Sequence, residues 1–130
     1  MKILIVEDSN TLRYMFVKMV RELGYKDITA VGSAEEAMPL LSNEKFDLVF
    51  LDWNLPKMSG FDLLRYIRAS PPIAASNVIM VTTVHERNNI IKALQVGLQG
   101  YMLKPIQKDL LLEKIKEIEG KLAELARSSE

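Results

Sequence analysis

The chain of 130 residues is long enough for one domain of ordinary size with a single hydrophobic core. Its 48% hydrophobic and 26% charged residues are typical of a globular protein that folds in water. Lys plus Arg and Asp plus Glu both number 17, so the net charge is zero and no basic surface is expected to bind nucleic acid. The absence of Cys excludes disulfides and thiolate metal sites.

A short apolar run at residues 3–6 opens the chain and ends at the adjacent carboxylates Glu7 and Asp8. Four apolar residues are too few for the core of a secretory signal or for a membrane span. We therefore interpret the run as a buried strand of a cytoplasmic protein with no membrane partner.

Helical and strand patterns then alternate along the chain. Ser9 or Asn10 caps a helix that ends before Gly24, and Ser33 opens a capping-box sequence at the start of a second helix. Pro39 lies inside this second helix and should kink or shorten it. The apolar face expected for the first helix comprises Leu12, Met15, Phe16, Met19, Val20 and Leu23. Further strands are expected at residues 28–31, 48–51, 78–81 and 101–103, and further helices at residues 61–68, 86–96 and 108–127.

The run at residues 48–51 is continuously apolar, as in strands that are buried on both faces of a parallel sheet. Asp52 follows the end of this strand, and Asn54, Pro56 and Gly60 supply turn chemistry after it. Taken alone, an Asp in such a position is more often a turn former or a helix cap than a reactive group. The other strand ends must therefore decide its role.

Strand and helix alternate five times, which predicts an α/β fold with a five-stranded, parallel, doubly wound sheet and helices on both faces. The carboxyl ends of all five strands then lie along one edge of the sheet, where ligands and chemistry gather. Polar side chains follow four of these ends, namely Glu7 with Asp8, Asp52, Thr82 and Lys104. Each has an ordinary structural interpretation by itself, but together they indicate a site.

Carboxylates gathered at one edge repel one another unless their charge is offset. Two of them ~4 Å apart repel by about 4 kcal/mol at an effective dielectric constant of about 20. Either the cluster is protonated, or Lys104 and a divalent cation neutralise it. Oxygen ligands without His or Cys favour Mg²⁺. A hydroxyl and an ammonium group opposite a carboxylate nucleophile suit a phosphoryl group, which favours formation of an aspartyl phosphate.

Four short motifs mark the strand ends: V-E-D-S after the first strand, L-D-W-N-L-P after the third, V-T-T after the fourth and Y-M-L-K-P at the fifth. Together they resemble the receiver domain of two-component response regulators, the CheY-like (βα)5 form of the flavodoxin-like fold. The resemblance covers residues 1–118, and the D-W-N triplet and Tyr101 look closest to the single-domain chemotaxis regulators. It implies a receiver domain at residues 1–119, with residues 120–130 as an extension of the last helix or a frayed tail.

The resemblance implies a metal and phosphoryl site at the first and third strand ends. Asp52 would be the phosphoacceptor. Asp8 and Asp52 would bind Mg²⁺ together with the main-chain carbonyl of Asn54, and Glu7 would act mainly through bound water.

The resemblance also implies a switch. Lys104 would pair with Asp52 and then with the phosphoryl oxygens, Thr82 would be the switch hydroxyl, and Tyr101 would change position with it. Pro105 would follow a cis peptide bond.

The chain is therefore expected to be a stand-alone signalling protein that catalyses only its own phosphorylation and dephosphorylation. The resemblance implies a histidine kinase as phosphodonor, a downstream target protein that binds the fourth helix, fifth strand and fifth helix, and a possible phosphatase. A phosphorelay shuttle is the alternative. A small aspartate-nucleophile phosphatase is less favoured, because such enzymes usually carry an Asp where this chain has Asn54. A phosphorylation-silent scaffold is disfavoured, because every reactive residue is present.

The last helix carries an apolar stripe with 4-3-4-3 spacing, formed by Leu111, Ile115, Ile118, Leu122 and Leu125. Its early members should cover the sheet, whereas its last two could dock on a partner or on a second copy. Gly120 weakens the helix, so a frayed tail is the other interpretation. The chain is accordingly expected to be a monomer or a weak dimer.

Overall fold

Each apolar run of the sequence becomes a strand of one sheet. The computed structural model describes residues 1–128. Its strands lie in the order β2-β1-β3-β4-β5, and every neighbouring pair is parallel. They are β1 (Lys2–Val6), β2 (Asp27–Val31), β3 (Leu48–Leu51), β4 (Val78–Thr82) and β5 (Gly100–Leu103). All residues of β3 and β4 are buried, which explains why these sequences are continuously apolar instead of alternating.

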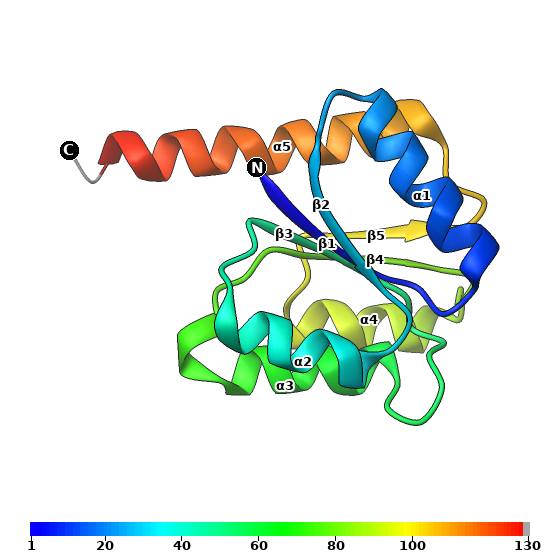
Figure 1. The fold of residues 1–130 in the computed structure, drawn as a ribbon. Helices are drawn as coiled ribbons and strands as arrows, with labels where there is room; N and C mark the ends of the chain where they lie inside the picture. The colour runs from blue at the N-terminus through cyan, green and yellow to red at the C-terminus, as the bar shows by residue number, and fades with distance from the viewer. Residues whose placement is uncertain (129–130) are drawn as a thin grey trace.

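Two helices cover one face of the sheet and three cover the other (Figure 1). The first pair is α1 (Asn10–Glu22) and α5 (Lys108–Ser128), and the second face carries α2 (Ala34–Asn43), α3 (Gly60–Ala69) and α4 (Arg87–Gly97). The predicted doubly wound α/β fold is thereby confirmed. A short 3₁₀ turn, η1 (Pro71–Ile73), lies between α3 and β4.

The helix ends follow the expected cap chemistry. Ser9 Oγ accepts from the backbone N–H of Leu12 at 3.2 Å at the start of α1, and Gly24 beyond its end adopts φ 102°. Ser33 caps α2 in the same way. The prediction that Pro39 shortens α2 is wrong, because the helix continues to Asn43 with Ala37 and Leu41 buried against the sheet.

The apolar face predicted for α1 is only partly correct. Phe16 and Val20 are buried, but Leu12 is 43% and Met15 53% exposed. The helix starts in the loop that follows β1, so its first residues lie beside the carboxyl edge of the sheet and not over its face.

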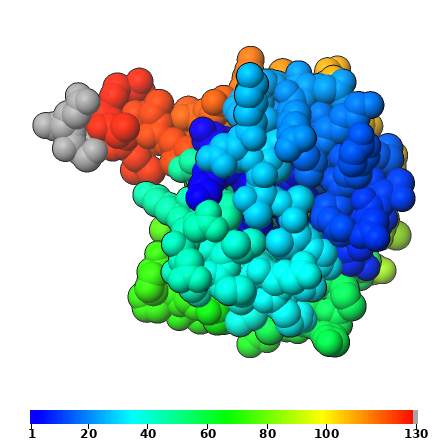
Figure 2. Space-filling model, in the orientation of Figure 1, coloured from blue at the N-terminus to red at the C-terminus, as the bar shows by residue number. Residues whose placement is uncertain are grey.

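The far end of α5 extends beyond the sheet (Figures 1 and 2). Leu111, Ile115 and Ile118 are buried, Leu122 packs at the border of the same cluster, and Leu125 is 66% exposed. The helix continues to Ser128, and residues 129–130 of the predicted extension lie outside the described residues. Within residues 1–128, no helix is long and apolar enough to cross a membrane.

Candidate functional site

The central strands β1 and β3 end side by side, and an acidic residue follows each of them. Val6 pairs with Leu51, and the backbone N–H of Asp52 donates to Val6 O at 3.1 Å. Glu7 and Asp52 are only 3% and 5% exposed, whereas Asp8 faces solvent. Carboxylate oxygens of the three residues lie within 4.8 Å of one another. The strand ends thus assemble the predicted acidic cluster.

Lys104, which follows β5, reaches both buried carboxylates. Its Nζ donates to Asp52 Oδ2 at 2.6 Å and also to Glu7 Oε1. Burial raises the pKa of Glu7, and the hydrogen bond from Lys104 only partly opposes this effect. Burial lowers the pKa of Lys104, but its hydrogen bonds to Asp52 and Glu7 outweigh burial, so the pKa is raised and the ammonium stays protonated. With Asp8 beside this pair of carboxylates, a single ammonium leaves negative charge at the edge.

The donor set fits a hard divalent cation. Three carboxylates without His or Cys suit Mg²⁺, and solvent access at Asp8 leaves room for the water ligands that Mg²⁺ commonly retains. The backbone N–H of Asn54 donates to Asp52 Oδ1 at 3.1 Å, so the loop after β3 lies beside the cluster. The role of the Asn54 carbonyl as a ligand stays a prediction.

Gly60 is a residue of the site that sequence reasoning treated only as a turn former. A Cβ at this position would lie 1.8 Å from the carbonyl oxygen of Asp52, and the Gly60 N–H donates to Trp53 O at 2.8 Å. Only glycine permits so close an approach of two backbone segments. The glycine in the sequence was the available signal, but its contact with Asp52 is a tertiary property.

Thr82 and Tyr101 meet at the backbone of Val84. Thr82 is fully buried, and its Oγ1 accepts from the Val84 N–H at 3.3 Å. The Tyr101 hydroxyl donates to Val84 O at 2.6 Å. Burial, followed by the charges of Glu86 and Asp52, raises the pKa of Tyr101 to about 12, so the hydroxyl remains a donor at neutral pH. The two predicted switch residues are therefore joined through one peptide segment, and the described hydrogen bonds include none between Thr82 and Asp52.

Trp53, directly after Asp52, provides an optical probe of the site. Its ring stacks on Phe61 of α3 with centroids 4.9 Å apart and an interplanar angle of 12°. Lys92 of α4 lies 5.7 Å from the centroid of Phe61. Trp53 is the only Trp of the chain, so its fluorescence reports on this region alone.

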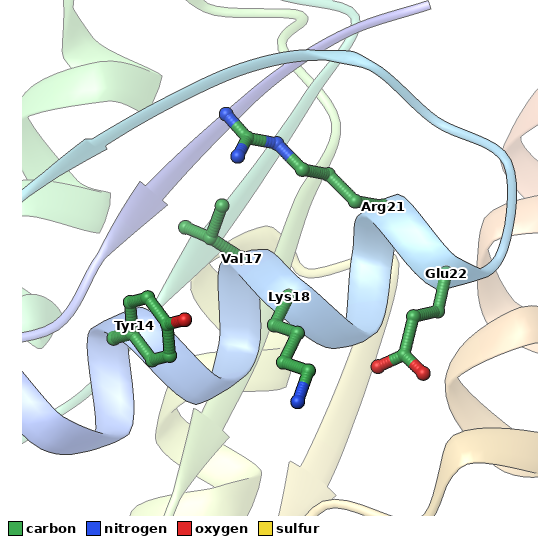
Figure 3. Close-up of a pocket in the computed structure, with 5 residues that line it drawn as sticks. All are labelled: Tyr14, Val17, Lys18, Arg21 and Glu22. Atoms are coloured by element: carbon green, nitrogen blue, oxygen red, sulfur yellow. The ribbon is translucent and has the colours of Figure 1, made fainter.

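Two surface hollows of the described residues contain no residue of this site. One, of about 310 Å³, lies along α1 and is lined by Tyr14, Val17, Lys18, Arg21 and Glu22 (Figure 3). The other, of about 560 Å³, includes Phe46, η1 and Leu122. The acidic cluster and Lys104 therefore belong to neither hollow.

Lys104 precedes Pro105 through a cis peptide bond, as the resemblance implied. Comparison with known proteins agrees with this geometry. Residues 3–116 match the response regulator receiver domain family.

The chain is 41% identical over 118 residues to the chemotaxis protein CheY of Pseudomonas aeruginosa, covering 91% of this chain and 95% of that protein. It is 40% identical over 118 residues to the chemotaxis protein CheY-3 of Vibrio cholerae, covering 91% of each. The solved CheY-like receiver domain protein of Methanospirillum hungatei has a TM-score of 0.85 at 31% identity, covering 95% of this chain and 97% of that one. The chain therefore belongs to the response regulator receiver family, whose members are phosphoacceptor signalling domains that generally bind Mg²⁺ at such an acidic cluster.

Proposed function

We propose that the protein is a chemotaxis response regulator that accepts a phosphoryl group on Asp52 from a histidine kinase. The observation that carries the proposal is the position of Asp52. Its nearly buried carboxylate ends a central strand 2.6 Å from the Lys104 ammonium and beside Glu7 and Asp8. Similarity to two chemotaxis proteins over most of the chain supports the pathway.

In the proposed reaction a carboxylate oxygen of Asp52 attacks phosphorus, the bond from phosphorus to the donor imidazole nitrogen breaks, and an acyl phosphate forms. Such reactions depend mainly on positioning and charge stabilisation. Glu7, Asp8 and Asp52 would hold Mg²⁺, which supplies positive charge for the phosphoryl oxygens. Lys104 already donates to Asp52, and it would transfer this hydrogen bond to a phosphoryl oxygen.

Thr82 would transmit the structural effect of phosphorylation from Asp52 to Tyr101. When its hydroxyl donates to a phosphoryl oxygen, the hydrogen bond from Val84 N–H weakens or is lost. Because the Tyr101 hydroxyl donates a hydrogen bond to Val84 O, movement of the backbone at Val84 changes the position of the Tyr101 ring as well. The Val84 peptide thereby couples the two switch residues.

The hydrogen bond of Thr82 cannot complete this switch alone. A shift from 1:99 to 99:1 requires about 5.5 kcal/mol, whereas a hydrogen bond to a charged group contributes roughly 1.5–3 kcal/mol. Lys104, Mg²⁺ and the bound target must supply the remainder. We therefore expect a partial shift in the free phosphorylated protein.

The target would bind the surface of α4, β5 and α5. This surface exposes four large apolar side chains that are 36% to 49% accessible, namely Ile91, Leu94, Leu103 and Leu110.

A phosphorelay shuttle would use the same chemistry, and transfer of the phosphoryl group from Asp52 to a second histidine protein would distinguish it. Asn54 stands where an aspartate phosphatase needs an acid or base, which argues against that activity.

Residues 1–119 would form the receiver domain and residues 120–130 its extension, in a cytoplasmic monomer or weak dimer. Its partners would be the kinase, the target and a possible phosphatase. Sedimentation of the full chain and of a chain truncated after Glu119 tests the dimer. If truncation leaves the oligomeric state unchanged, with and without phosphorylation, a dimer formed through the extension is excluded.

Intact-mass measurement after incubation with acetyl phosphate tests the proposed phosphoacceptor. We expect one phosphoryl adduct that requires Mg²⁺ and is absent from Asp52→Asn. Asp109→Asn, an exposed carboxylate at the start of α5, is the matched control and should be modified normally. An adduct that persists in Asp52→Asn, or no adduct in the unmodified chain, would contradict the proposal.

A further inference from the structure

Arg13 of α1 turns its guanidinium back toward the acidic cluster. Nη1 donates to the main-chain carbonyl of Glu7 at 2.9 Å and, at 3.5 Å, to that of Asp8, while Nη2 donates to Asn10 Oδ1. Long side chains of a helix point toward its N-terminus, which explains how Arg13 reaches the loop before α1. All three acceptors are neutral, so the contacts hold two main-chain carbonyls and one side-chain amide and do not pair charges.

The helix dipole by itself disfavours a cation at this position, whereas the nearby carboxylates of the acidic cluster favour one. The N-terminus of a helix carries positive partial charge and favours acidic residues, yet the first turn of α1 contains none. Within residues 1–128, Arg13 forms no salt bridge. Its hydrogen bonds go to the main-chain carbonyls of the loop, and they hold the two residues that carry the cluster's first carboxylates.

Gly32, directly after β2, lies against the same guanidinium. A Cβ at Gly32 would be 3.2 Å from Arg13 Nη1, tighter than ordinary van der Waals contact. The φ of Gly32 lies outside the left-handed range, so the absence of a side chain provides space and not backbone freedom. The Glu7 N–H donates to Val31 O, which brings this segment beside the loop after β1.

We propose that Arg13 is a positioning residue for the metal site, acting through the peptide groups of Glu7 and Asp8 to hold Asp8 toward Mg²⁺. The inference rests on the proposed function. Anchoring and charge have opposite consequences. Loss of a nearby positive charge strengthens cation binding, whereas loss of the anchor weakens it, so the sign of the change separates the two roles.

Titration of the whole chain with Mg²⁺, followed by Trp53 fluorescence and by calorimetry, tests the proposal. Arg13→Met should raise the Mg²⁺ dissociation constant about tenfold, the size found when partners that orient metal ligands are removed. Arg13→Lys keeps the charge but lacks the forked donors, so it should restore only part of the loss. Amide hydrogen exchange at residues 8–10 without Mg²⁺ should become faster in Arg13→Met.

Arg21→Met is the matched control, because it removes the same charge from the same helix about 12 Å farther along. Its Mg²⁺ affinity should stay within about twofold of the unmodified chain. Unchanged or tighter Mg²⁺ binding in Arg13→Met overturns the positioning role while leaving the proposed function intact. An unmodified chain that binds no Mg²⁺ and accepts no phosphoryl group would overturn both.

Gly32→Ala provides a second, milder test that does not remove the guanidinium. We expect about threefold weaker Mg²⁺ binding in the unmodified background and no further loss in Arg13→Met, because both changes act through one contact. If Gly32→Ala weakens Mg²⁺ binding equally in the unmodified chain and in Arg13→Met, Gly32 does not act through Arg13. If Arg13→Met does not fold, Gly32→Ala and Arg13→Gln decide the question, and unchanged Mg²⁺ affinity in both overturns the proposal.

Discussion

A partly buried cation lies at each end of the sheet, Lys104 at the carboxyl edge and Arg68 at the amino edge, and the two have different hydrogen-bond partners. At the carboxyl edge, the Lys104 ammonium faces the carboxylates of Glu7 and Asp52. At the amino edge, the guanidinium of Arg68 on α3 donates only to neutral oxygens. These are the main-chain carbonyls of Gly97, Ala74 and Ser76 at 3.0, 2.9 and 2.6 Å, and Gln99 Oε1 at 3.1 Å.

The network around Arg68 is complete without a ligand. Burial lowers the pKa of Arg68, but an arginine remains charged, and the chain itself supplies an acceptor for each contact. Gln99 Oε1 also accepts from the Val78 N–H at 2.7 Å, so the network joins α3, the start of β4 and the end of α4. The carboxyl edge keeps surplus negative charge instead. A cation whose hydrogen-bond donors are satisfied by the chain stabilises the fold, whereas surplus carboxylate charge provides a binding site.

Gly60→Ala should have the largest effect, because it forces two backbone segments of the carboxyl edge apart. The added Cβ would lie 1.8 Å from Asp52 O, and relief of this clash should cost about 3 kcal/mol or more in the free energy of unfolding. Mg²⁺ binding should weaken as well. Urea denaturation and a Trp53 titration measure the two losses.

Gly120→Ala is the control for Gly60→Ala, because no atom lies within 4 Å of a Cβ at Gly120 on α5. It should stabilise the protein by roughly 0.5–1 kcal/mol through helix propensity, without changing Mg²⁺ affinity. Similar stability of the two variants would show that the loop after β3 yields easily and that Gly60 does not constrain Asp52.

Arg68→Met should reduce stability and leave the site unchanged. It removes the donor of three partly buried main-chain carbonyls and one of the two donors of Gln99 Oε1, for a loss of about 2–3 kcal/mol in the free energy of unfolding. Arg65→Met on the same helix removes only an exposed cation 6.0 Å from the Phe61 ring and should cost below about 1 kcal/mol. A large fall in Mg²⁺ affinity in Arg68→Met would contradict the independence of the two edges.

The carboxyl edge was predictable from the sequence to a greater extent than the amino edge. Parallel topology brings the residues after the strands together, so Glu7, Asp52 and Lys104 could be placed at one site from strand order alone. Arg68 was missed because its acceptors come from two loops, and loop carbonyls leave no pattern in the sequence. The contact of Gly60 with Asp52 was missed for the same reason.

Periodicity also failed where a helix extends past the sheet. Leu12 and Met15 share the apolar spacing of α1 but are exposed, because the spacing states which side chains share a face and not what lies opposite. On α5 the prediction was correct instead, because the early members of the stripe are buried and Leu125 is exposed. The heptad-like stripe is real as a pattern, yet only its first part covers the sheet.

Glu7→Gln tests whether the carboxyl edge carries excess charge, with a smaller effect that depends on pH. Burial raises the pKa of Glu7, so its contribution to stability is full below the unfolded value of 4.5 and is lost as pH rises through the folded value. Without Mg²⁺, the free energy of unfolding of Glu7→Gln minus that of the unmodified chain should increase from pH 4 to pH 7. The sign of this change is the prediction.

Glu7 uses two oxygens, Oε1 for Lys104 and Oε2 for the Ser9 N–H, whereas Gln offers one, so Glu7→Gln also loses a hydrogen bond and only the change with pH is diagnostic. Thermal or urea unfolding at both pH values measures it. A difference that stays constant, or that falls as pH rises, would mean that Lys104 already neutralises the cluster and that no surplus charge distinguishes this edge.

Tyr101→Phe should have the smallest effect on stability. It removes one hydrogen bond to Val84 O at the partly buried ring, at a cost below about 1 kcal/mol. Tyr25→Phe is the control, because its hydroxyl also donates over 2.6 Å, but to Glu119 on α5. Both variants should accept a phosphoryl group on Asp52 to the normal extent.

The two tyrosine variants should differ in how phosphorylation changes the structure of the surface at α4. If Val84 couples Thr82 to Tyr101, phosphorylation should change amide hydrogen exchange in the first turn of α4 in the unmodified chain and in Tyr25→Phe. The change should be reduced in Tyr101→Phe, since the hydroxyl that donates to the Val84 carbonyl is missing. Equal changes in all three proteins would show that the signal leaves the carboxyl edge by another route, and the Trp53–Phe61–Lys92 contacts would then be the next to test.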